Sequence, residues 1–159
     1  LDIHDISRAA KTYGVKALYL VTPLADQKVL ANKIIAHWTD GVGADYNPDR
    51  RDALELIRVK DALDDVTEDI KSIENREPKT VTTCARKYPT SVGYIEFRDM
   101  LAGGWPHLLI FGTAWGLDES VISEADLVLE PITGATEYNH LSVRSAASII
   151  LDRLLGPRE

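Results

Sequence analysis

Hydrophobic positions along the chain switch repeatedly between helical and strand spacing. Within Asp2–Tyr13 the apolar residues recur every three or four positions and Gly14 follows them, which predicts a helix that stops at this glycine. The same spacing predicts further helices over Ala25–Trp38, Leu63–Ile73, Tyr94–Leu101, Asp118–Ser123 and Leu141–Leu155. Gly156 is expected to end the last of them.

Short apolar runs between these helices predict buried strands. Lys16–Thr22 is one such run, and Pro23 ends it. The other predicted strands are Leu54–Val59, Thr80–Cys84, Leu108–Phe111 and Leu127–Leu129. The segment Gly41–Arg51 is polar and contains Gly, Asn and Pro, so a loop is predicted there. Because strands alternate with helices, we expect parallel strand pairing in a three-layer α/β fold.

The size and composition of the chain are those of one globular domain. Its 159 residues leave room for a single full hydrophobic core, so one domain over residues 1–159 is predicted. The apolar runs are far shorter than the roughly 20 residues of a membrane span, and we expect a cytoplasmic protein. Cys84 is the only cysteine, which excludes an internal disulfide. No group of Cys and His has the spacing of a zinc site, so no metal is expected.

The charge of the chain limits how it can bind nucleic acid. The net charge is −7, which disfavours a protein that covers RNA or DNA with its whole surface, since phosphate binding depends on Lys and Arg. Local basic groups could still contact RNA, although scattered charges of this kind are typical of solvated surface. These groups are Arg50–Arg51, Arg86–Lys87, Arg144 and Arg153.

Three loops follow predicted strands and are the candidate ligand site. Ligands of parallel α/β sheets bind beyond the carboxyl ends of the strands, which selects Thr82–Ser91, Gly112–Leu117 and Glu130–Ser142. Gly112 and Gly116 would let a ligand approach the main chain closely, although a plain turn explains them as well. The absence of G-x-G-x-x-G and Walker A patterns disfavours Rossmann-type and P-loop nucleotide binding.

Polar residues near the two ends of the chain are further candidates. His4 and Arg8 lie four residues apart on the first predicted helix, with Asp5 between them, and a surface ion pair is the plain interpretation. Ser142 or Asn139 is expected to cap the last helix. The remaining candidates, His37, His107 and Cys84, are interpreted as packing or surface residues.

Three segments together resemble, in order, the three motifs of the SpoU-type methyltransferases of the SPOUT (α/β-knot) superfamily. Asp2–Gly14 is similar to the first motif, and Arg8 falls on the family's catalytic arginine. Asp2 and His4 replace the Asn and Gly of that motif.

The second and third motifs are matched with further replacements. Phe111-Gly112 and Gly116-Leu117 resemble the second motif, with Thr113-Ala114 in place of its Glu. Pro131-Ile132 and the segment from His140 to Arg144 resemble the third, with His140 at the Asn position and Arg144 at an Ala position. Nearly the whole chain is similar to a smaller bacterial group of RNA-methyltransferase-like SPOUT domains.

The resemblance implies an S-adenosylmethionine-dependent RNA methyltransferase. It implies tRNA or rRNA as substrate, with the ribose 2′-hydroxyl as one acceptor, and a trefoil knot in the last third of the chain. It also implies a homodimer through the first and last helices, which would bring Arg8 of one subunit near the cofactor of the other. The residues expected at the cofactor are Thr82, Thr83, Phe111, Gly112, Thr113, Gly116, Leu117, Pro131, Ile132, His140, Leu141 and Ser142.

Catalytic roles follow from the same resemblance and from side-chain chemistry. A guanidinium stays protonated, so we expect Arg8 to orient phosphate and hydroxyl groups, while His4 or His140 accepts the proton. The first alternative is a module on the same fold that binds S-adenosylmethionine or RNA without catalysis, which the acidic charge and the replaced motif residues favour. The second is an unrelated flavodoxin-like or nucleotide-binding α/β protein.

Overall fold

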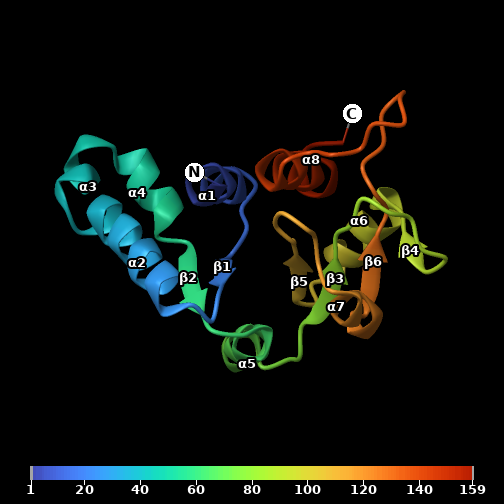
Figure 1. Ribbon diagram of the computed structural model, residues 1–159, viewed down its shortest axis with the longest axis horizontal. Helices are drawn as coiled ribbons and strands as arrows, with labels where there is room; N and C mark the ends of the chain where they lie inside the picture. The colour runs from blue at the N-terminus through green and yellow to red at the C-terminus, as the bar shows by residue number, and fades with distance from the viewer. Residues whose placement is uncertain (1, 159) are drawn as a thin grey trace. The chain divides into compact units, whose positions relative to one another are not determined.

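The structure, a computed structural model, describes residues 2–158. The chain divides after Asp69 into two compact units, each with its own parallel sheet (Figure 1). The boundary falls within helix α5, Leu63–Glu74.

The first unit is built on two parallel strands, β1 and β2. β1 (Leu18–Val21) pairs with β2 (Ile57–Lys60) from Leu18 opposite Ile57 to Val21 opposite Lys60. Helix α1 packs against α4, and α2 packs against α3 and α4. The bounds of these helices are α1 Asp2–Thr12, α2 Ala25–Thr39, α3 Val42–Tyr46 and α4 Pro48–Leu54. Their contacts bury the small residues Ala10, Ala31 and Ala53, which allow close helix approach.

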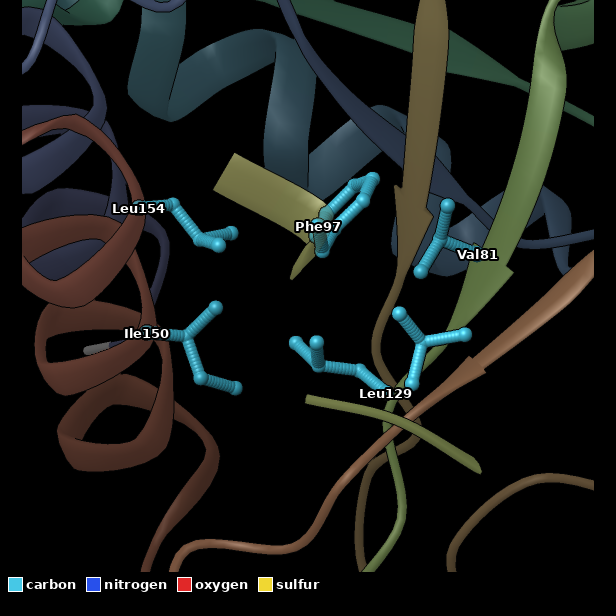
Figure 2. Packing of buried hydrophobic residues seen from close by; sticks show 6 residues of the cluster. Val81, Phe97, Leu129, Ile150 and Leu154 are labelled. Carbon is cyan, nitrogen blue, oxygen red and sulfur yellow. The ribbon is translucent and has the colours of Figure 1, made fainter. Parts of the chain in front are cut away.

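The second unit carries a four-stranded parallel sheet in the order β4-β6-β3-β5. The bounds of its elements are β3 Lys79–Thr82, β4 Ser91–Val92, α6 Tyr94–Ala102, β5 His107–Ile110, α7 Glu119–Glu124, β6 Leu127–Leu129 and α8 Val143–Leu155. Its core joins the sheet to α6 and α8, because Val81 and Leu129 meet Phe97, Ile150 and Leu154 (Figure 2). Burial of such aliphatic and aromatic side chains contributes roughly 1.5–3 kcal/mol each.

The expected α/β class with parallel strands is confirmed, and most predicted helices and strands are present. The loop predicted for Gly41–Arg51 is wrong, because α3 and α4 occupy most of it. The Asn47 side chain accepts a hydrogen bond from the Arg50 amide, and Pro48 follows at the first helical position. Asn and Pro therefore start a helix here. Both residue types are common at helix starts as well as in turns.

Three predicted strand boundaries also differ from the structure. Leu54 ends α4 instead of opening the strand, which begins at Ile57. The strand predicted over Thr80–Cys84 ends at Thr82, so Cys84 lies half-buried in the following loop. The predicted Leu108–Phe111 strand is displaced by one residue, and only Ile110 in it is buried because β5 is an edge strand.

Two further features of the fold concern its shortest strand and the length of its helices. β4 begins at Ser91, the last residue of the predicted loop Thr82–Ser91, and its two residues are too few to leave a pattern in the sequence. Among the described residues, no helix has the length and apolar character that a membrane span requires.

Candidate functional site

The loops after β3, β5 and β6 lie at one edge of the second unit's sheet. β3 pairs in parallel with both β5 and β6, so the three carboxyl ends point the same way, as Figure 1 shows. The Asn139 side-chain amide donates a hydrogen bond of 2.9 Å to the carbonyl of Ala85, which ties the loop before α8 to the loop after β3. The structure thus brings together the loops that the sequence selected.

The loop after β5 is a tight turn that folds back on its own start. A Cβ atom at Gly112 would lie 2.5 Å from the carbonyl carbon of Gly116 and 2.7 Å from the amide nitrogen of Leu117. The Gly116 amide donates to the carbonyl of Thr113 at 3.0 Å, and Gly116 has a φ of +84°. The turn itself therefore requires both glycines. It leaves residues 113–116 exposed, with their main-chain groups near the strand end.

Residues beneath these loops are apolar or tied to the sheet. Phe111 and Ile132 are half-buried and pack against the core cluster. Thr83 donates to the carbonyl of Ile110 from its amide at 3.1 Å and from its hydroxyl at 3.0 Å. Thr82 is fully buried, whereas Thr83 is partly accessible. The site thus has an apolar floor and a rim of main-chain groups.

The start of α8 forms the third side of this edge. Ser142 accepts a hydrogen bond of 3.3 Å from the Ser145 amide and donates one of 2.9 Å to the Ser145 hydroxyl. The predicted cap is therefore Ser142, while Asn139 bridges to the other loop. His140 and Leu141 are exposed, and the His140 ring meets Tyr138 edge-on, with 5.5 Å between ring centroids.

His4 belongs to a cluster of ring and guanidinium groups in the first unit. Its ring stands edge-on to Trp38 at 6.0 Å between centroids, and the Arg50 guanidinium lies over the Trp38 ring at 4.5 Å. The His4 Nδ1 atom is buried without a hydrogen-bond partner among the described residues. Burial and, second, the charge of Arg50 lower the pKa of His4 below its ordinary value of 6.5. The His4 imidazole is therefore mainly neutral near pH 7 and can accept a proton.

Arg8 lies one helical turn beyond His4 on α1 and is exposed. The sequence selects these two residues through the family resemblance and the chemistry of histidine, but it does not reveal Trp38 or the role of Arg50 beside His4. Trp38 and Arg50 reach His4 only through the packing of α1, α2 and α4, and no local pattern encodes that contact.

The other two histidines have packing contacts. Nδ1 of His107 lies 2.7 Å from the carbonyl oxygen of Trp105, and the ring meets Phe97 edge-on at 5.4 Å. His37 is exposed and stands edge-on to Trp38 at 5.1 Å. Both agree with the interpretation as packing or surface residues.

Two cavities are lined by residues other than those expected at the cofactor. A cavity of about 420 Å³ in the first unit is acidic and includes Asp61, Asp65 and Asp69. A cavity of about 250 Å³ in the second unit lies between α7 and the segment around Tyr88. Neither contains an expected cofactor residue. Within residues 2–158, no three His, Cys, Asp or Glu side chains are grouped so as to hold a metal ion.

Comparison with known proteins gives matches over almost the whole chain. The sequence model of a family described as "SAM-dependent RNA methyltransferase" matches residues 1–156. A tRNA (guanine-N(1)-)-methyltransferase of Oleidesulfovibrio alaskensis is 44% identical over 156 residues, which are 98% of this chain and 36% of that protein. A protein of Aquifex aeolicus is 40% identical over 159 residues, which are 98% of this chain and 77% of that protein.

A solved structure shares the fold. The SpoU methyltransferase AviRb from Streptomyces viridochromogenes, in complex with AdoMet, has a TM-score of 0.60 at 19% identity, over 97% of this chain and 54% of that chain. At this identity the likeness concerns the fold alone. The chain spans little more than a third, 36%, of the Oleidesulfovibrio methyltransferase that it matches.

Proposed function

This chain belongs to the S-adenosylmethionine-dependent RNA methyltransferase family, and from that premise we propose that it transfers a methyl group from S-adenosylmethionine to RNA. The observation that carries the proposal is the convergence of the loops after β3, β5 and β6 at one sheet edge. Ligands of parallel α/β sheets bind at this edge.

The residues of these loops fit the cofactor. Phe111 and Ile132 supply apolar surface for an adenine ring, and the turn from Gly112 to Leu117 presents main-chain groups for the ribose and the amino-acid part. Thr83, Thr113, Pro131, His140, Leu141 and Ser142 complete the proposed site, and the fully buried Thr82 supports it from the end of β3. When bound, the cofactor supplies a methyl group on a positively charged sulfur.

Arg8, His4 and His140 have the proposed catalytic roles. Arg8 is exposed and permanently charged, which suits it to binding phosphate and orienting the acceptor group. His4 is the preferred proton acceptor because its lowered pKa keeps it neutral at pH 7. His140, exposed beside Tyr138, is the second candidate.

A homodimer and a knotted last third of the chain are parts of the same proposal. Pairing through α1 and α8 would combine Arg8 and His4 of one subunit with the cofactor loops of the other. The methyl acceptor would then be bound by residues of two chains. A single domain over residues 1–159 and a cytoplasmic location belong to this proposal as well.

We take tRNA as the substrate because the Oleidesulfovibrio relative is named for a tRNA reaction. That relative's reaction at guanine N1 is not assigned to this chain, since most of its length has no counterpart here. The acceptor atom is therefore left to experiment, with the ribose 2′-hydroxyl as one candidate.

Transfer of tritiated methyl groups to bulk tRNA and rRNA tests the proposal. We expect incorporation into tRNA, and we expect Arg8→Ala to lower it by about 100-fold, the usual cost of losing one charged or hydrogen-bonding group at a reaction centre. Calorimetry should show unchanged S-adenosylmethionine binding by this variant. Lys11→Ala, a change of another exposed basic residue on α1, is the matched control and should be fully active.

Two other outcomes of these experiments would favour the alternative functions. Cofactor binding without methyl transfer to any RNA would favour the non-catalytic module, which the net charge of −7 and the replaced motif residues also favour. Binding of flavin or nucleotide in place of S-adenosylmethionine would favour an unrelated α/β protein.

A further inference from the structure

Two exposed aromatic side chains stand on the loops of the proposed cofactor site. Trp115, in the turn after β5, is 101% exposed, and Tyr138, in the loop before α8, is 76% exposed. Both loops begin at the same sheet edge, because β5 and β6 pair in parallel with β3 on either side. An indole that contacts no other part of its own unit is a large apolar surface left in water.

The turn that carries Trp115 has a fixed shape. The residues on either side of Trp115 have left-handed conformations: Ala114 has a φ of +48° and Gly116 a φ of +84°. A left-handed alanine is strained and persists where its surroundings determine it. The close approach of Gly112 to Gly116 supplies that constraint. The indole is therefore held outward by the backbone and does not depend on side-chain packing.

The neighbourhood of these aromatics offers little free positive charge. Arg86 forms an ion pair with Glu119 at 2.7 Å, and Lys87 forms one with Glu130 at 2.9 Å. With a net charge of −7, the chain gains little from counterion release when it meets RNA. Affinity for RNA must then come largely from contacts with bases, and stacking on aromatic rings is the main contact of that kind.

The neighbours of both aromatics favour a base over a protein partner. Thr113 and Ala114 precede Trp115, and Glu137 and Asn139 flank Tyr138, whose ring meets that of His140 edge-on. The neighbours of both rings along the chain are therefore polar or small. Protein interfaces are built instead on continuous apolar patches. An exposed planar ring outside a continuous apolar patch suits an unpaired nucleobase.

We propose that Trp115, assisted by Tyr138, stacks on an unpaired base of the RNA substrate beside the methyl donor. The inference rests on the proposed function, and it assigns a specificity-determining contact to residues outside the motif positions. Stacking is tolerant of base identity, so Trp115 would select single-stranded or extruded nucleotides rather than one sequence.

Fluorescence anisotropy with two labelled probes tests this contact. One probe is an oligoadenylate of roughly 12 nucleotides, and the other is an abasic oligonucleotide of the same length, which keeps the phosphates and lacks the bases. We expect the wild-type chain to bind the oligoadenylate about 10-fold more tightly, and we expect Trp115→Ala to remove most of this difference. Tyr46→Ala, which removes an 86% exposed aromatic in the first unit, should preserve it.

Two further measurements separate the possible failures. Equal affinity of wild-type protein and Trp115→Ala for the oligoadenylate would overturn the inference, as would a Trp115→Ala protein that loses dimers in sedimentation, because the ring would then belong to a subunit interface. Calorimetry with S-adenosylmethionine reports on the proposed function separately, and Trp115→Ala should bind the cofactor as the wild-type chain does. Thermal melting confirms that the variant is folded.

Discussion

At the residue scale, the shape of the turn after β5 depends on the absence of a side chain at Gly112. A methyl group there would lie 2.5 Å from a main-chain carbon of Gly116, and neither backbone segment can give way cheaply. We expect Gly112→Ala to lower the free energy of unfolding by about 1–3 kcal/mol, the typical cost of overpacking. It should also weaken S-adenosylmethionine binding, which calorimetry measures.

Gly134 provides the matched control for this change. It lies in the loop after β6, and a Cβ atom there would meet nothing within 4 Å. Gly134→Ala should leave both stability and cofactor binding unchanged. Wild-type cofactor affinity in Gly112→Ala would show that the turn does not shape the site.

His4 makes the stability of the protein depend on pH. Burial and the charge of Arg50 hold its pKa in the folded state below the ordinary 6.5, so the unfolded chain binds the proton first as the pH falls. The free energy of unfolding should therefore decrease on acidification, starting near pH 6.5 and continuing until His4 is protonated in the folded state as well. Denaturant unfolding of wild-type protein and His4→Gln at several pH values measures this.

The expected difference between the two proteins has a definite sign. His4→Gln should lose less stability than the wild-type chain between about pH 7 and pH 5. Parallel curves would contradict the burial of a neutral imidazole. Arg50→Ala, which removes one of the charges that lower this pKa, should bring the His4 titration measured by NMR closer to 6.5.

At the element scale, α8 connects the core to the candidate site. Ile150 and Leu154 anchor it in the core, while Ser142 caps its first turn. Ser142→Ala should lower the free energy of unfolding by about 1 kcal/mol, because the Ser145 amide loses its acceptor. Ser148→Ala is the control, since Ser148 lies within the helix and its hydroxyl donates to the Arg144 carbonyl of the preceding turn. Equal unfolding curves for the two variants would contradict the capping role.

Elements with a clear amphipathic stripe were predictable, and those defined by tertiary contacts were not. The α8 stripe follows directly from its pattern because one face of the helix is buried in the core. The β6 strand follows from its apolar run because Val128 and Leu129, which point to opposite faces, are both buried. The segment containing α3 and α4 was misassigned, since Asn47 and Pro48 suit a turn as well as a helix start and only packing against α2 decides. The glycines of the site were found from the sequence, whereas the grouping of His4, Trp38 and Arg50 needed the packed helices.

At the scale of the whole molecule, strand and helix alternation was enough to predict parallel pairing, but not the division of the strands between two sheets. That division depends on strand order, which periodicity does not encode. The negative charge is likewise a property of the entire chain. Under the proposed function, it favours RNA binding through specific contacts over binding through a broad basic surface.

A crystal structure of the protein with S-adenosylmethionine tests the central claim most directly. We predict the adenosyl group against Phe111 and Ile132, with the main chain of Gly112–Leu117 and the start of α8 around the rest of the molecule. A cofactor bound in the acidic cavity around Asp65, or crystals that take up none at saturating concentration, would contradict it.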